Sequence, residues 1–260
     1  MRSFGCILAR IVAICVVSFL TAEGHAQVSN LAADWSNVSN PNGPWALYKA
    51  PGQLFTVVQP DWYNNGTGQP AWADASSTTP FPPNPLAPLW AKAIGDVGTL
   101  FGGGYDGFVD AGTVFMHSAE AFRTGTDFTS VVWTSPQEGI VRIDGGLWIA
   151  KVFDRPHTWE LRRNGTTFTS GSLNQADPYT KDNPFTFAAG SGGAESVRLE
   201  VAANEQIELV IYRPLGTLVP GTLVGMNYEI RFVPEPGSLV LGVTGCAAIG
   251  WGLVRRRRWA

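Results

Sequence analysis

Cysteine is scarce in this 260-residue chain, and its central part has none. The three cysteines are Cys6, Cys15 and Cys246, so residues 27–233, here called the body, contain no thiol. This excludes a disulfide scaffold and a cysteine-ligated metal site for the body. The body is nevertheless long enough to bury one hydrophobic core without cross-links.

Charged residues and histidine are also few. Charged residues make up 15% of the chain, and the body has 12 Lys and Arg against 19 Asp and Glu, with no basic cluster. An acidic body without a basic patch argues against nucleic acid as a partner. Its two histidines, His117 and His157, have no Ser-plus-acid pattern nearby, so the sequence indicates no catalytic triad.

The body lacks the apolar spacing of helices and shows short runs typical of strands. Alternation is clear at Met226, Tyr228 and Ile230, and Asn164-Gly165 is a strong hairpin signal. We expect another turn at residues 144–146. The pattern predicts an all-β fold, a single antiparallel β-sandwich of jelly-roll-like type. The predicted strands are Leu54–Val58, Thr113–His117, Thr129–Thr134, Ile140–Asp144, Leu147–Phe153, His157–Arg163, Ser196–Val201, Gln206–Tyr212 and Met226–Phe232.

Residues 59–94 are rich in proline and show no regular period, which predicts a long ordered loop on the body. The loop carries four large aromatic residues among Asn, Gly, Ser and Thr: Trp62, Tyr63, Trp72 and Trp90. Flat aromatic faces suit sugar rings, so these four are candidate carbohydrate-binding residues. The alternative is that the rings anchor the loop to the sandwich.

The N-terminal 26 residues are typical of a secretory signal peptide. Arg2 and Arg10 supply positive charge around an apolar run, and Gly24-His25-Ala26 offers small residues for cleavage. We expect cleavage after Ala26.

The C-terminal residues 234–260 have three parts in a fixed order. Pro234-Glu235-Pro236 is a rigid break, residues 238–254 are an uncharged apolar run, and Arg255, Arg256, Arg257 and Arg258 follow. An apolar run of this length approaches the ~30 Å of a bilayer core, and an Arg cluster is retained on the cytoplasmic side. The sequence therefore predicts a transmembrane helix at about 238–254.

This tail resembles the PEP-CTERM sorting signal. The resemblance implies export across the inner membrane of a Gram-negative-type cell. It also implies a transient membrane anchor, removal of that anchor by an exosortase-type protease, and a final place on the cell surface or outside the cell. The body is also similar to a domain of exported proteins in bacteria that carry such tails. The similarity is carried by Trp133–Pro136 with Gly139–Gly145, by Arg163-Asn164-Gly165 and by Val201–Val210. The charged run His157–Arg163 and the loop Gly190–Gly193 depart from it.

Two pairs of acidic residues in turn-rich sequence are weak candidates for Ca²⁺ binding through oxygen ligands: Asp106, Asp110, Asp177 and Asp182. The alternative is that they are solvated turn residues, and no other cofactor is expected. The sequence thus predicts an exported, surface-sorted, non-catalytic protein of the extracellular matrix or envelope, with extracellular polysaccharide as a candidate partner. The alternatives are a secreted glycoside-active enzyme, whose paired carboxylates no pattern nominates, and a purely structural surface protein.

Overall fold

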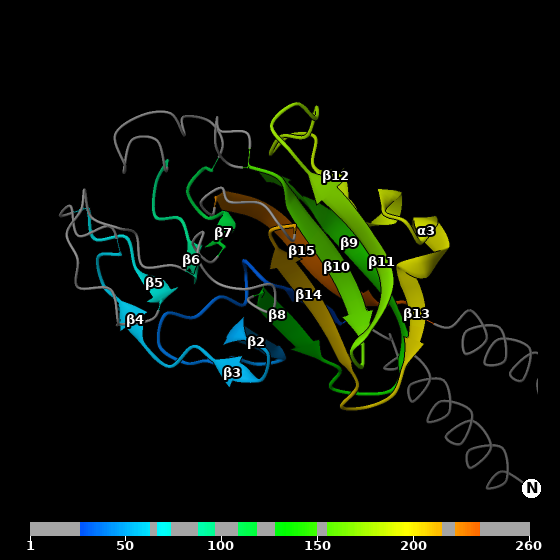
Figure 1. Ribbon diagram of the computed structural model, residues 1–260. Helices are drawn as coiled ribbons and strands as arrows, with labels where there is room; N and C mark the ends of the chain where they lie inside the picture. The colour runs from blue at the N-terminus through cyan, green and yellow to red at the C-terminus, as the bar shows by residue number, and fades with distance from the viewer. Residues whose placement is uncertain are drawn as a thin grey trace, which may run out of the picture. The chain divides into compact units, whose positions relative to one another are not determined.

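The protein folds into two antiparallel β-sheets that face one another as a β-sandwich (Figure 1). The computed structural model describes residues 27–62, 67–73, 88–96, 109–118, 128–149, 155–214 and 222–234. Within these ranges Val28–Phe232 form one compact unit. Among the described residues, helical structure is limited to a 3₁₀ turn, η1 (Phe187–Ala189), and one short helix, α3 (Gly193–Ser196).

The larger sheet has nine strands among the described residues, and β15 (Leu223–Phe232) lies inside it. The path of neighbours runs β12-β9-β15-β7-β6-β5-β4, while β1 also pairs with β15 and β13 with β9. The other bounds are β1 (Val28–Asn30), β4 (Val58–Gln59), β5 (Ala71–Ala73), β6 (Leu89–Lys92), β7 (Val114–His117), β9 (Gly139–Ile149), β12 (Phe185–Thr186) and β13 (Arg198–Val201).

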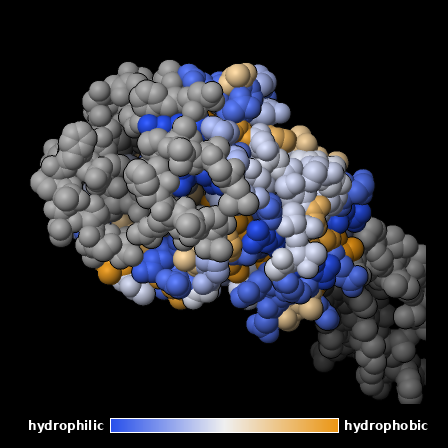
Figure 2. Space-filling view, in the orientation of Figure 1, coloured by the Kyte–Doolittle hydropathy of each residue, from blue (hydrophilic) through white to orange (hydrophobic). Residues whose placement is uncertain are grey.

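The smaller sheet has six described strands in the order β11-β10-β14-β8-β2-β3. Their bounds are β2 (Trp45–Ala50), β3 (Gln53–Leu54), β8 (Thr129–Thr134), β10 (His157–Arg163), β11 (Thr166–Leu173) and β14 (Gln206–Tyr212). The face in view over β10, β11 and β14 is mainly pale and blue in Figure 2, as their alternating Thr, Ser and charged residues require.

The main core lies between the two sheets, where alternate residues of each strand meet. Trp133 and Leu209 of the smaller sheet and Ile143 and Met226 of the larger one belong to it. A second cluster contains Trp62, Phe115 and Trp148, with Ala71 and Ala91 of β5 and β6. Because neighbouring residues of β5, β6 and β7 belong to different clusters, these strands are buried on both faces.

The sandwich and most of its later strands are confirmed. Strands β7, β8, β10 and β14 lie where the sequence predicts strands, and β10 and β11 form a hairpin through Asn164-Gly165. Both hairpin residues have positive φ, 48° and 80°, as a two-residue turn of this kind requires.

The turn predicted at residues 144–146 is wrong, because β9 continues through it as one strand of 11 residues. The two glycines at 145 and 146 are needed because the neighbouring strands come too close for a Cβ atom. A Cβ on Gly145 would lie 2.0 Å from the carbonyl oxygen of Asn227, and one on Gly146 would lie 2.3 Å from that of Phe185. The predicted strand Leu54–Val58 is likewise divided between β3 and β4.

The continuous loop predicted for residues 59–94 is also wrong, since β5 and β6 lie within it and pair with each other. The two ends of the chain fall outside the described residues, and with them Ala26, Glu235, Pro236, the predicted helix at 238–254 and Arg255–Arg258. Within the described ranges, no helix is long and apolar enough to cross a membrane.

Candidate functional site

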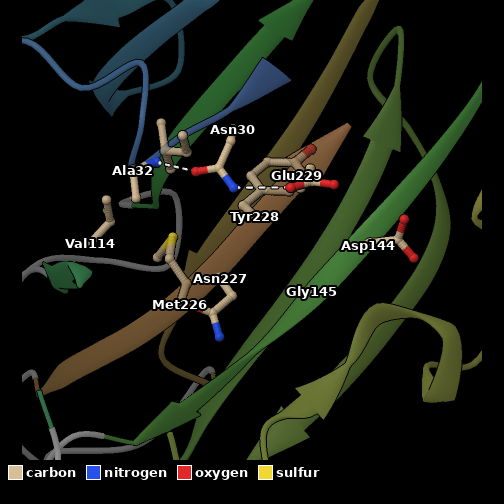
Figure 3. Close-up of a pocket in the computed structure, with 10 residues that line it drawn as sticks. Asn30, Ala32, Val114, Asp144, Gly145, Met226, Asn227, Tyr228 and Glu229 are labelled. Atoms are coloured by element: carbon tan, nitrogen blue, oxygen red, sulfur yellow. Dashed lines mark hydrogen bonds between the residues drawn. The ribbon is translucent and has the colours of Figure 1, made fainter. Parts of the chain in front are cut away.

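A notch of about 260 Å³ opens beside β15, between the stretches of that strand that pair with β7 and with β1 (Figure 3). Strand β7 pairs with β15 only as far as Met226, and β1 pairs with it only from Glu229 onward. Between these partners the Tyr228 carbonyl accepts the N–H of Leu31 at 3.0 Å, and Asn227 has no strand partner on this edge among the described residues. The notch therefore follows directly from the register of three strands.

Polar groups from three strands line the notch. Asn227 and Glu229 come from β15, Asn30 from the end of β1, and Asp144 from β9. The Nδ2 of Asn30 donates to a Glu229 carboxylate oxygen at 3.1 Å, the bond drawn in Figure 3. Leu31, Ala32, Val114 and Met226 add apolar surface. The lining thus combines amide, carboxylate and hydrocarbon groups.

The acid of β9 is neutralised by two arginines. Arg142 Nε contacts one oxygen of Asp144 at 2.9 Å, and Arg231 Nη2 contacts the other at 2.7 Å. Glu229 lies directly opposite Asp144 on β15, and Arg231 lies opposite Arg142. Carboxylate thus lies opposite carboxylate and guanidinium opposite guanidinium, and both guanidinium groups contact Asp144.

Hydrogen bonds fix the chain that forms one wall of the notch. Asn30 Oδ1 accepts the N–H groups of Ala32 and Ala33 at 3.1 and 3.0 Å. The Asp34 carboxylate accepts the main-chain N–H of Asn30 and the indole N–H of Trp45, both at 3.0 Å. Lys92 Nζ donates to the Ala32 carbonyl at 2.7 Å. The wall is held by bonds to several distant elements.

A buried histidine–serine pair joins the two sheets at one end of the sandwich. His157 of β10 lies 2.7 Å through Nε2 from Ser118 Oγ, which follows β7, and its Nδ1 lies 2.9 Å from the Arg155 carbonyl. A carbonyl can only accept, so Nδ1 carries the proton and Nε2 accepts from Ser118. Both side chains are buried.

The 2.7 Å between His157 Nε2 and Ser118 Oγ is typical of a catalytic base and its serine nucleophile, but the His157 pKa does not suit that role. Burial lowers the pKa of His157 to about 4, although the hydrogen bond to the Arg155 carbonyl opposes that shift. A base with so low a pKa accepts a proton poorly at neutral pH. The pair is suited to linking the sheets, and the sequence does not reveal it because its members are 39 residues apart.

Three of the four predicted carbohydrate-binding aromatics are buried in the structure. Trp62, Trp72 and Trp90 are 3%, 4% and 0% exposed. Trp72 and Trp90 are cross-strand partners on β5 and β6, and Trp62 packs against Phe115 with ring centroids 5.9 Å apart. In this conformation their faces contact protein, which is the anchoring alternative. Tyr63 lies outside the described residues, and Trp62, Trp72 and Trp90 do not line the notch.

Of the acidic residues considered for Ca²⁺, Asp110 and Asp182 both lie near Lys181 and act on its charge. Asp110 forms an ion pair with Lys181. Asp177 accepts the main-chain N–H groups of Asn174 and Tyr179, which closes a turn. Asp106 lies outside the described residues. Among those described, no group of three or more His, Cys, Asp or Glu could hold a metal ion.

The notch is not predictable from the sequence, because its lining comes from four separate segments. Residues 30–32, 114, 144–145 and 226–229 contribute, and none of these segments carries a recognisable motif. Only the alternation of β15, which places Asn227 and Glu229 on one face, is apparent in the sequence.

Comparisons with known proteins do not assign a family. No family model matches the chain, and no curated protein matches it. Among solved structures, an insecticidal delta-endotoxin from Bacillus thuringiensis has 16% identity and a TM-score of 0.29, over 56% of this chain and 22% of its own. An arabinose-bound α-L-arabinofuranosidase has 11% identity and a TM-score of 0.27, over 48% of this chain and 20% of its own. This chain thus spans about a fifth of either protein.

Proposed function

We propose that this protein is an exported, surface-sorted, non-catalytic protein of the extracellular matrix or envelope that binds carbohydrate. The observation that carries the proposal is the C-terminal order of Pro234-Glu235-Pro236, an uncharged apolar run and four arginines. The signal-peptide pattern that ends at Ala26 supports the same destination.

The proposal includes the processing that this tail implies. Residues 238–254 anchor the chain in the inner membrane during transit, and an exosortase-type protease then removes them. The body remains as the mature protein, a β-sandwich that we place in the jelly-roll type.

Two features of the body support a binding role over catalysis. The notch carries hydrogen-bonding groups beside apolar surface, a composition suited to polar ligands with C–H faces. Asp144 is engaged by Arg142 and Arg231, and the low pKa of His157 makes it a weak base toward Ser118. Neither arrangement offers an acid or base poised for proton transfer at neutral pH.

Mass spectrometry of the protein from its native host tests the sorting proposal. The mature C-terminus is expected near residues 234–237, and the mature N-terminus at Gln27. A variant with Pro234 and Pro236 both changed to Ala should retain its tail. Recovery of intact Arg255–Arg258 on most parent molecules in a host with an exosortase contradicts the proposal.

A further inference from the structure

We propose that the notch beside β15, lined by Asn30, Asn227 and Glu229, binds one neutral sugar unit of a polysaccharide. This inference rests on the proposed function and names the site and the ligand class. The four loop aromatics predicted from the sequence are not required for it.

The electrostatics of the notch favour a neutral ligand. The carboxylates of Asp144 and Glu229 are matched in number by the guanidinium groups of Arg142 and Arg231, both of which contact Asp144. A sulfated or uronic acid unit would place a further anion beside two carboxylates. A neutral sugar adds no charge, and its hydroxyls can both donate and accept.

Hydrogen-bonding capacity remains in the notch after its internal bonds are counted. The side chain of Asn227 is exposed and makes no hydrogen bond to another described residue. Only one of the two Glu229 carboxylate oxygens receives the Asn30 amide. The Asn227 amide and the second Glu229 oxygen can each bond a sugar hydroxyl.

The size and rigidity of the notch limit the ligand to a single unit. A volume of about 260 Å³ is below the range of ~300–1,000 Å³ that holds drug-sized molecules. The bonds that fix Ala32 and Asp34 hold the wall in place before a ligand arrives, which lowers the ordering cost of binding. With few contacts, we expect weak binding, with Kd on the order of millimolar.

The test compares full-length parent with Asn227→Leu and with the matched change Asn183→Leu. Asn183 is an exposed asparagine in a turn outside the notch. Binding to dextran, laminarin and xylan, as neutral polysaccharides, and to alginate, as an acidic one, is measured by affinity electrophoresis. The parent and Asn183→Leu should bind at least one neutral polysaccharide in preference to alginate, and Asn227→Leu should bind at least tenfold more weakly.

Each outcome decides the question. Equal retention of parent and Asn227→Leu overturns the notch while leaving carbohydrate binding in place. Retention by alginate alone overturns the neutral ligand class. If the parent binds none of the four polysaccharides, both the notch and carbohydrate binding are rejected. The sorting proposal is tested separately, by mass spectrometry. Matched circular dichroism spectra and melting temperatures show that Asn227→Leu is folded; if it is not, Asn227→Gln with the same readout replaces it.

Discussion

Asn40 joins three main-chain groups from two segments of the chain. Its Nδ2 donates to the carbonyls of Leu47 and Phe55 at 2.8 and 2.9 Å, and its Oδ1 accepts the N–H of Leu47 at 2.8 Å. Gln69 has the same role elsewhere. It is fully buried and bonds the main chain of Pro70, Lys92 and Ile94. Single amides thus replace ladder hydrogen bonds where the strands are short.

Replacing Asn40 with Ala should lower the free energy of unfolding by about 2–4 kcal/mol, because three main-chain groups lose their partner. Urea denaturation followed by tryptophan fluorescence measures the change. Asn37→Ala is the matched control, since this exposed residue accepts one bond, from Trp35 Nε1, and should cost less than about 1 kcal/mol. Equal losses for both variants would contradict the role given to Asn40.

The hydrogen bonds of Asn40 and Gln69 cannot be predicted from the sequence. Asn40 lies in a cluster of turn formers, and its character as a turn residue is predictable. Its partners are 7 and 15 residues away, and those of Gln69 lie up to 25 residues away. A side-chain bond over such a separation leaves no local pattern.

Among the strands, β11 has an open edge that a glycine-rich segment covers. The Ser191 N–H donates to the Ser170 carbonyl at 2.8 Å, and Ser191 Oγ accepts the Ser170 N–H at 3.0 Å. Gly190 permits this approach, because a Cβ there would lie 2.4 Å from Thr169 Oγ1 and 2.7 Å from the Trp159 ring. The segment thus protects a strand edge from pairing with other chains.

Gly190→Ala should therefore lower the free energy of unfolding by about 1–3 kcal/mol and increase association of the folded protein. Chemical denaturation and light scattering at raised concentration are the measurements. Gly193→Asn is the control, because its φ of 72° suits Asn and a Cβ at this position would meet no atom within 4 Å. An unchanged Gly190→Ala variant would show that the segment does not need this close contact.

Most strands predicted correctly have one wet face, whereas β7 and β8 are buried strands rich in β-branched and aromatic residues. Strands β10, β14 and β15 alternate, so their positions follow from the sequence. Strands β5 and β6 do not, since Ala71, Trp72 and Ala73 are all buried and their neighbours are prolines and polar residues. The glycines of β9 wrongly predict a turn, because glycine serves both turns and close strand contact. The notch could not be predicted either, since its shape depends on where the pairing of β15 with β7 and with β1 ends.

At the scale of the whole molecule, the two sheets are tied at one end by His157 and Ser118. The Ser118 Oγ that donates to His157 also accepts the N–H of Thr222, beside the start of β15. The charged or titratable groups that act on His157 are His117, Arg213 and Arg155, and all three disfavour its protonated form. A pH low enough to protonate His157 therefore breaks its hydrogen bond from Ser118, because protonated Nε2 can no longer accept.

We expect the stability of the whole protein to fall as the pH is lowered from about 6.5 to about 4. His157 is neutral in the folded protein down to a pKa of about 4, whereas in the unfolded chain it takes up a proton near 6.5. Its contribution is complete above pH 6.5, is lost progressively toward pH 4, and amounts to about 3 kcal/mol. Urea denaturation at a series of pH values measures the loss.

His157→Gln should remove this part of the pH dependence, and His117→Gln should leave most of it in place, because burial lowers the pKa of His157 more than His117 does. NMR titration of the His157 ring in the parent gives an independent reading, and a titration near pH 6.5 in the folded state would reject the explanation. A separate loss is expected below about pH 4.5, because the hydrogen bond from Arg163 lowers the pKa of Glu205 to about 2.

The place of β15 in the larger sheet also bears on the order of events during synthesis. This strand is the last of the described strands to be made, yet β1, β7 and β9 all pair with it. A growing chain that lacks residues 223–232 leaves β1 and β7 without that partner, and the pairing of β1 spans about 200 residues. Closing such distant contacts is slow. The larger sheet is therefore completed only after nearly the whole body has been made, and β1 waits through most of translation for its partner.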